Sequence, residues 1–365
     1  MLVDEIRVET RDGSTELSGR VTMHHLDTED LRIWFRGPEQ YSRGDLDASP
    51  FLPGLLLTAM WWKEDLAIDG PVSKRLLRNV NHAITEYRRV FPALPAIEVR
   101  AHKWKPPKAS PRTACLFSRG VDSWYSVLRS LEHKRRGRPP LTHLLYVPSI
   151  DFMYGDDNRA RSIAATQEAA AAVGCELVLL ETNLRHFTER FQHWGKTFGG
   201  GLSSIALAAS GFTHVLLAAS VPLGEENRSG SSVTLDPLFS TERTEIVHHG
   251  AEARRVDKVR FVAEHRVLLP YLKVCFVADT ATNCGECEKC LVTMVALHIA
   301  GALDGCSAFE RPLEADVVAQ MPDPGWQRFM FTELIDELGT SRMDAELRRA
   351  LEHVVYRDPA RPRGS

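Results

Sequence analysis

The spacing of apolar and polar residues organises the first hundred residues. Residues 5–10 alternate polar and apolar side chains as a half-exposed strand does, and Asp12-Gly13 marks a turn into a returning strand. The pattern predicts, in order, strands over 5–10, 16–23 and 31–35 and helices over 51–66 and 73–87. We therefore expect a smaller N-terminal α+β domain over residues 1–105, whose role the sequence does not reveal.

Short apolar runs then alternate with helix-like segments. Residues 103–112 are rich in proline and charge and indicate a linker. After it the pattern predicts strands over 113–117, 143–147, 177–180 and 214–218 and helices over 122–132, 160–173 and 202–209. Repeated β-α-β units favour an α/β fold with a doubly wound, parallel, five-stranded sheet, which we place within residues 113–306. Residues 307–365 predict a C-terminal helical extension, including a helix over 345–355.

Composition narrows the class of protein. Of 365 residues, 44% are hydrophobic and 25% charged, which argues against a mainly disordered chain. The balance of 45 Lys and Arg against 48 Asp and Glu, a net charge of -3, argues against a globally basic nucleic-acid coat. No apolar run approaches the roughly 18–20 residues of a membrane span, and the first residues lack the pattern of a signal peptide. Four of the 7 cysteines crowd into one stretch, which suggests a metal site in a reducing compartment. We expect a cytoplasmic protein without a membrane partner.

The first strand-to-helix turn of the predicted sheet is Ser118-Arg119-Gly120-Val121-Asp122-Ser123. A helix start offers unpaired N–H groups to phosphate, Gly120 permits close approach, and the two serines add hydroxyl donors. Asp122 repels phosphate, so it either holds Mg²⁺ or caps the helix. The alternative is an ordinary capped turn without a ligand.

This turn resembles the pyrophosphate loop, Ser-Gly-Gly-x-Asp-Ser, of the N-type ATP pyrophosphatase (adenine nucleotide alpha hydrolase, or PP-loop) superfamily, whose fold is HUP-like. The resemblance implies that ATP is cleaved between its α and β phosphates and that residues 118–123 bind it with Mg²⁺, with Ser118, Asp122 and Ser123 in catalytic roles. Arg119 stands where the superfamily usually has glycine. It is strained if that position needs a positive φ, or it adds a cationic contact to phosphate.

Four cysteines have metal-ligand spacing. Cys275, Cys284, Cys287 and Cys290 follow the pattern C-x₈-C-x₂-C-x₂-C, which suits tetrahedral Zn²⁺ in a structural site. An iron–sulfur cluster or redox-active thiols are the alternatives. The remaining three cysteines lie in apolar or small-residue settings and are expected to be buried: Cys115, Cys175 and Cys306.

A pyrophosphate loop followed by this cysteine spacing resembles the 7-cyano-7-deazaguanine synthase family, over roughly residues 113–302. That family activates a carboxylate with ATP, admits ammonia to give an amide, and dehydrates the amide to a nitrile. The chain departs from the family in the segment before the cysteines and in having residues 1–105 at all. The resemblance therefore implies a divergent relative with a small-molecule or modified-base carboxylate as substrate, a protein or RNA as a further possible acceptor, and a possible homodimer.

Other positions have a functional and a plain interpretation. By analogy with the superfamily, Asp151, which follows the second strand, lines an adenine pocket; the alternative is a simple exit turn. Arg228 binds a substrate carboxylate or phosphate, or lies in a solvated loop beside Glu225 and Glu226. By analogy with the superfamily, Lys258 or Arg254 reaches the triphosphate, although i,i+4 pairs on a surface helix explain these charges equally well.

Three further segments also have two interpretations. Gly199-Gly200-Gly201 opens a predicted helix and accepts an anion or forms a hinge. His248-His249 ligates a metal or, as the pattern favours, forms a turn pair, because no carboxylate or cysteine partner is suitably spaced. The basic run 134–138 complements a helix dipole or touches RNA.

We expect an ATP-dependent, AMP-forming ligase that uses ATP, Mg²⁺ and Zn²⁺. The acyl-adenylate would meet ammonia or another amine and give an amide, nitrile or conjugate. One alternative is a thiolation-type enzyme that modifies RNA or a nucleobase and needs a reactive, metal-free cysteine. The other is a non-catalytic ATP-binding subunit of a larger complex.

Overall fold

The computed structural model describes residues 1–24, 31–42, 44–132, 139–150, 156–225, 229–275 and 282–357. The chain divides into two compact units that interleave along the sequence. The first unit comprises Met1–Ser118, Ser126–Asp151 and Ala170–Ala251, and the second comprises Arg119–Tyr125, Phe152–Ala169 and Glu252–Ser365. The three regions expected from the sequence follow chain order, whereas packing unites the N-terminal region with the parallel sheet.

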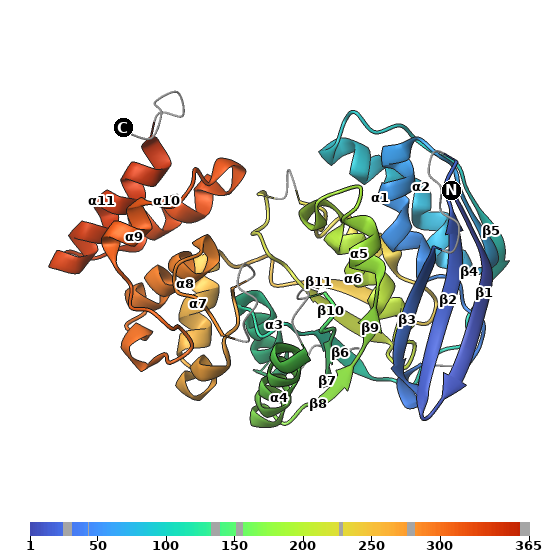
Figure 1. The fold of residues 1–365 in the computed structure, drawn as a ribbon, viewed down its shortest axis with the longest axis horizontal. Helices are drawn as coiled ribbons and strands as arrows, with labels where there is room; N and C mark the ends of the chain where they lie inside the picture. The colour runs from blue at the N-terminus through green and yellow to red at the C-terminus, as the bar shows by residue number, and fades with distance from the viewer. Residues whose placement is uncertain are drawn as a thin grey trace. The chain divides into compact units, whose positions relative to one another are not determined.

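A five-stranded parallel sheet lies in the first unit, as the sequence predicted (Figure 1). Its strands are β6 (Thr113–Leu116), β7 (Leu141–Tyr146), β8 (Glu176–Leu179), β10 (His214–Ala218) and β11 (Glu245–His249), in the order β11-β10-β6-β7-β8. All neighbouring pairs are parallel. The order reverses between β6 and β10, and ligands of open α/β sheets bind at the carboxyl ends of strands at such a point.

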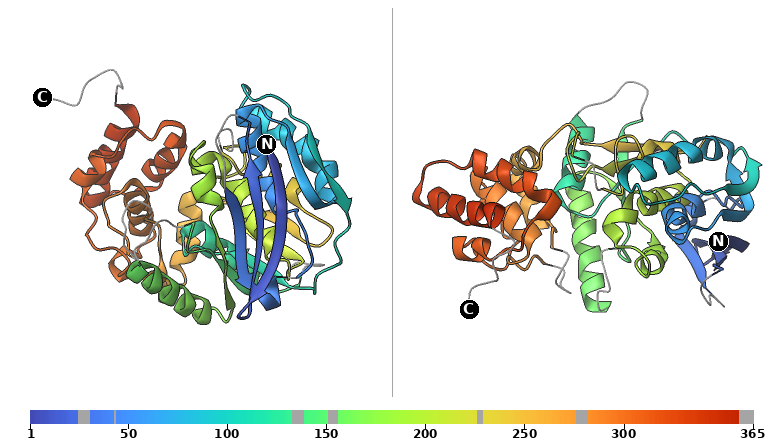
Figure 2. Two further views of the ribbon diagram at one scale, coloured as in Figure 1. Left: turned by 45° about the vertical axis from the view of Figure 1, so that its right-hand side comes forward. Right: turned by 90° about the horizontal axis from the view of Figure 1, so that it is seen from above.

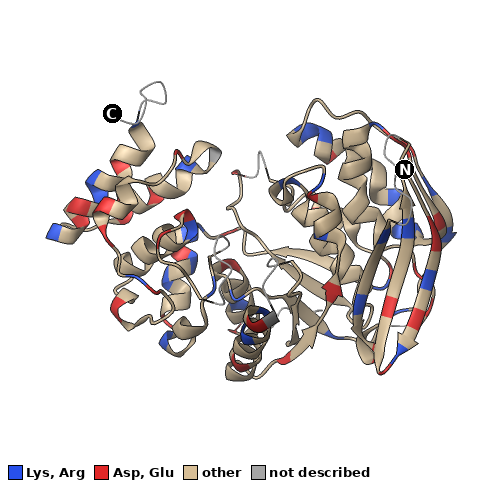
Figure 3. Ribbon diagram, viewed as in Figure 1, with Lys and Arg blue, Asp and Glu red and all other residues tan. Residues whose placement is uncertain are grey.

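A second, mixed sheet of six strands is built mainly from the N-terminal region. Its strands are β1 (Leu2–Arg11), β2 (Ser14–Thr22), β3 (Arg32–Pro38), β4 (Leu66–Ser73), β5 (Val99–Trp104) and β9 (Glu181–Thr182), in the order β5-β4-β1-β2-β3-β9. The predicted turn is confirmed: Asp12 and Gly13 have φ of 51° and 73° between the antiparallel β1 and β2. Acidic and basic residues are interspersed over β1–β3, as expected for a sheet with one solvated face (Figure 3).

Two expectations for this region are wrong. The helix predicted over 51–66 ends earlier, as α1 (Phe51–Trp62), and Leu66 begins β4. Lys63 closes α1 in a left-handed conformation, which ends a helix. The linker predicted over 103–112 contains the end of β5, which pairs with β4.

Helices fill the space between the two sheets of the first unit (Figures 1 and 2). These are α1, α2 (Lys74–Val90), α5 (Leu184–Thr188) and α6 (Trp194–Ala208). α6 packs against α1 and also contacts both β3 and β10. One continuous apolar core therefore runs from Val3 and Leu55 to Ile205 and Val215, all of which are fully buried or nearly so.

The second unit is helical. Its helices are α7 (Arg255–Ala263), α8 (Glu288–Ile299), α9 (Ala315–Ala319), α10 (Arg328–Glu337) and α11 (Arg342–Tyr356), with parts of α3 (Val121–Glu132) and α4 (Asp156–Ala172). Short 3₁₀ turns of this unit cover Arg266–Tyr271, Leu303–Gly305 and Gly325–Gln327, whereas those at Glu39–Tyr41 and Asp236–Phe239 belong to the first unit. The expected C-terminal helices are thus present, and a capping box of Ser341 and Asp344 starts α11. Among the described residues, no helix combines the length and apolarity that crossing a bilayer requires.

Candidate functional site

The turn predicted to bind phosphate leads from β6 into α3. Gly120 is the cap of α3, because its carbonyl accepts the first helical hydrogen bond from the Trp124 N–H at 2.9 Å. Ser123 donates its hydroxyl to the same carbonyl at 2.9 Å. Val121 is buried at the start of the helix, and Ser118 is the last residue of the preceding segment of the first unit. The alternative in which Asp122 caps the helix is wrong, since Gly120 holds that position.

Arg119 adopts a left-handed backbone conformation with φ of 62°. Such a conformation costs an L-residue about 1–2 kcal/mol relative to glycine. The side chain is only 4% exposed, and its Nη2 donates to Ser162 Oγ on α4 at 2.9 Å. The backbone carbonyl accepts from the Lys273 N–H at 3.1 Å. The position therefore has a positive φ, which glycine adopts more readily than arginine, and the guanidinium is hydrogen-bonded within the second unit.

Two cations of α7 converge on the carboxylate of Asp122. Arg255 Nη1 lies 2.5 Å from Oδ2, and Lys258 Nζ lies 3.3 Å from Oδ1. Burial alone would raise the pKa of Asp122, but the charges of Arg255 and Lys258 outweigh it and hold that pKa below the usual range. The Lys258 side chain is 1% exposed and also lies 5.7 Å from the ring centre of Tyr125.

The sum of these charges favours an anion at the start of α3. Two cations face one carboxylate, and the helix N-terminus adds positive potential. Lys258 is one of the two residues that we expected to contact the triphosphate. Arg254 instead pairs with Asp257 and Glu337, each at 2.8 Å. Arg255 was missed, because two adjacent arginines at a helix start look like solvent-facing charges and only tertiary packing distinguishes them.

The glycine run 199–201 lies inside α6 and does not open it, so the prediction of a helix start there is wrong. A Cβ on Gly199 would meet the Gly230 carbonyl oxygen, and one on Gly200 would meet the Pro53 carbonyl oxygen, far inside contact distance. The glycines therefore serve close packing of α6 against neighbouring backbone. Asp151, Arg228 and Glu226 lie outside the described residues, as does the basic run 134–138, so their expected roles stay predictions.

His248 and His249 lie on β11, and the prediction of a turn pair is wrong. His248 Nδ1 is 2.8 Å from Asp236 Oδ2, which also accepts from Ser231 Oγ at 2.6 Å. Both side chains of the Asp236–His248 pair are at most 1% exposed. The sequence gives little signal for this network, since Asp236 lies in a proline-containing turn and the histidines interrupt the apolar pattern of a buried strand.

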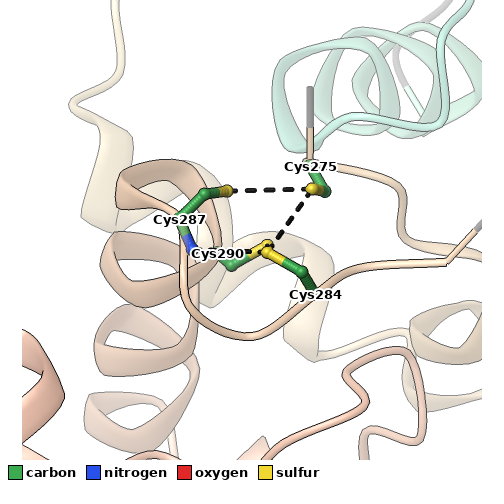
Figure 4. A group of neighbouring side chains, drawn as sticks. All are labelled: Cys275, Cys284, Cys287 and Cys290. Atoms are coloured by element: carbon green, nitrogen blue, oxygen red, sulfur yellow. Dashed lines mark hydrogen bonds between the residues drawn. The ribbon is translucent and has the colours of Figure 1, made fainter. Parts of the chain in front are cut away.

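The four predicted cysteine ligands come together in the second unit (Figure 4). Cys287 and Cys290 lie at the start of α8, and Cys275 and Cys284 lie on two facing segments. Their sulfur atoms all lie within 4.8 Å of one another, with individual separations of 3.6, 3.8 and 3.9 Å. Four bonds of 2.3 Å to a tetrahedral ion place sulfurs about 3.8 Å apart. The group can therefore hold a metal ion such as zinc.

The backbone around the cysteines also suits a metal. The N–H groups of Glu286 and Cys287 point at Cys284 Sγ, at 3.4 and 3.3 Å, as in a tight Cys-x₂-Cys turn. Gly285 has φ of 75° in that turn. The sulfur atoms are as close together as ligands of a single ion. This spacing disfavours an iron–sulfur cluster, whose irons and sulfides hold the cysteine thiolates farther apart.

No family model, curated protein or solved structure matches the chain. The α3 turn with its cations and the four-cysteine group are therefore the features from which a function is inferred.

Proposed function

We propose that the chain is an ATP-dependent, AMP-forming enzyme with a HUP-like core, and that the turn of residues 119–123 binds the ATP phosphates. The observation that carries this proposal is the convergence of Arg255 and Lys258 on Asp122 at the N-terminus of α3. The 3-2-1-4-5 strand order of the parallel sheet supports it, because the turn follows the central strand directly.

The chemistry follows from the charges. Arg255 and Lys258 would exchange part of their attraction to Asp122 for attraction to phosphate oxygens, and the freed carboxylate would hold Mg²⁺. A substrate carboxylate would attack the α-phosphorus, forming a C–O–P linkage and releasing pyrophosphate. An amine would then form the C–N bond and release AMP. Positioning and neutralised phosphate charge supply the catalysis, because an ionised carboxylate needs no general base to attack.

The cysteine centre fits a structural zinc ion. Cys275, Cys284, Cys287 and Cys290 would hold it with four thiolates and leave no open coordination position. Zinc in such a site contributes folding energy and takes no part in bond making.

The thiolation alternative has less support. It requires a reactive, metal-free cysteine with a lowered pKa, whereas burial raises the pKa of Cys175 to about 11 and also raises the pKa of Cys115 and of Cys306. A non-catalytic ATP-binding subunit remains the second candidate, because Arg119 fills a position that glycine would leave open to a ligand.

The test is to incubate ATP labelled on the α-phosphate with Mg²⁺ and a panel of carboxylates that includes deazapurine carboxylates. AMP and pyrophosphate are expected, and Arg255→Gln and Asp122→Asn should lower the rate by at least about a hundredfold, as losses of charge stabilisation do. Arg254→Gln is the matched control, since its neighbours are Asp257 and Glu337. ATP binding without AMP formation would favour the non-catalytic subunit, and ADP as product would exclude both.

A further inference from the structure

One buried asparagine ties the cysteine segments together. Asn283 precedes Cys284 and is 0% exposed. Its amide uses all four of its hydrogen-bonding positions on backbone groups: Nδ2 donates to the carbonyls of Leu272 and Ala308, both at 2.8 Å, and Oδ1 accepts from the N–H groups of Val274 and Cys275 at 2.7 and 3.0 Å. This asparagine therefore fixes residues 272–275 against residues 282–284.

Lys273 connects the segment of residues 272–275 to the α3 turn. Its Nζ donates to the Thr282 carbonyl at 2.6 Å, which adds a further hydrogen bond between the two cysteine segments. Its backbone N–H donates to the carbonyl of Arg119 at 3.1 Å. Arg119 is the left-handed residue of the turn, and a strained backbone persists only where its surroundings hold it.

We infer that metal loading of the cysteine centre and nucleotide binding at the α3 turn are coupled, with Lys273 and Asn283 as the positioning residues that join them. The inference rests on the proposed function, since it needs ATP to bind at that turn. A metal ion fixes Cys275 relative to the other three cysteines. It thereby keeps the neighbouring Lys273 N–H in place to donate to the Arg119 carbonyl. Without the ion, residues 272–275 are held to residues 282–283 by hydrogen bonds alone, so the support of the turn weakens.

The coupling is tested through binding, without any assay of turnover. The affinity for MgATP is measured by calorimetry on zinc-loaded protein and on chelator-treated protein whose folding is checked by circular dichroism. We expect MgATP to bind at least about tenfold more weakly without zinc, within the range of ordinary coupling between sites. Coupling is reciprocal, so MgATP should tighten zinc binding by the same factor, measured by competition with a chromophoric chelator. This second measurement starts from zinc-loaded protein and does not depend on a folded zinc-free state.

A pair of asparagine variants tests whether Asn283 joins the metal centre to the α3 turn. Asn283→Ala should weaken zinc and MgATP binding together, each by about tenfold or more. Asn183→Ala is the matched control, because Asn183 also braces two backbone groups, the Arg32 carbonyl at 2.7 Å and the Trp34 N–H at 3.0 Å, but lies in the first unit. It should leave both affinities unchanged.

Equal MgATP affinity with and without zinc, or zinc affinity that ignores MgATP, would overturn the coupling while leaving the proposed function intact. Asn283→Ala protein with wild-type MgATP affinity would do the same. Zinc-loaded wild-type protein that does not bind MgATP would overturn the proposed function and the coupling with it.

Discussion

Replacing Arg119 by glycine or by alanine separates the backbone of the α3 turn from its side chain. Both variants lose the same guanidinium, its bond to Ser162 at 2.9 Å and the burial of its stem. They differ in how they tolerate the φ of 62°. Alanine keeps a strain of about 1–2 kcal/mol, which glycine relieves. Glycine in turn loses roughly 0.5–1 kcal/mol more chain entropy on folding.

The difference predicts that Arg119→Gly is the more stable variant by up to about 1.5 kcal/mol, the reverse of the usual order for these residues outside turns. Urea unfolding followed by circular dichroism measures it as a higher midpoint at unchanged slope. An alanine variant more stable than the glycine variant would contradict a left-handed backbone at this position.

Three further outcomes are expected. Gly200→Ala should lose at least about 3 kcal/mol of unfolding free energy because its Cβ meets backbone, whereas Gly44→Ala, with nothing within 4 Å, should change it by less than about 0.5 kcal/mol in urea titrations. The pKa of Asp122 is lowered in the folded protein, so its ion pairs stabilise the fold fully at pH values above the unfolded carboxyl pKa of about 4. This stabilisation is lost as the pH falls through the folded-state pKa. Asp122→Asn should therefore flatten the dependence of unfolding free energy on pH in that acid range. Cys287→Ser should lose stoichiometric zinc by elemental analysis, whereas Cys306→Ser, outside the cluster, should keep it.

Much of the fold follows from local patterns. The strand at His214–Ala218 has the predicted bounds, and the β-α-β alternation predicted the parallel sheet. β4 was missed because Gly70 and Pro71 interrupt it, at a register shift that tolerates both. β11 was missed because its two histidines hide the apolar pattern, and the burial of His248 depends on Asp236, which is distant in sequence from β11.

The candidate site divides in the same way. The cysteine spacing alone predicted four sulfurs close enough for one ion, because short spacings leave the chain little freedom. The turn before α3 also follows from sequence, including the consequence of a positive φ at Arg119. The roles of Arg255 and Asn283 do not, since each depends on partners that only the tertiary fold brings near. Sequence patterns predict such residues poorly because their partners are set by packing.

The central claim is that the turn of residues 119–123 holds the ATP phosphates. A crystal structure with Mg²⁺ and an ATP analogue that resists cleavage between the α and β phosphates tests it most directly. We expect the triphosphate to lie against the backbone at the start of α3, with Arg255 and Lys258 turned away from Asp122 and toward the phosphate oxygens. A triphosphate bound elsewhere, or an empty turn at saturating nucleotide, would contradict it.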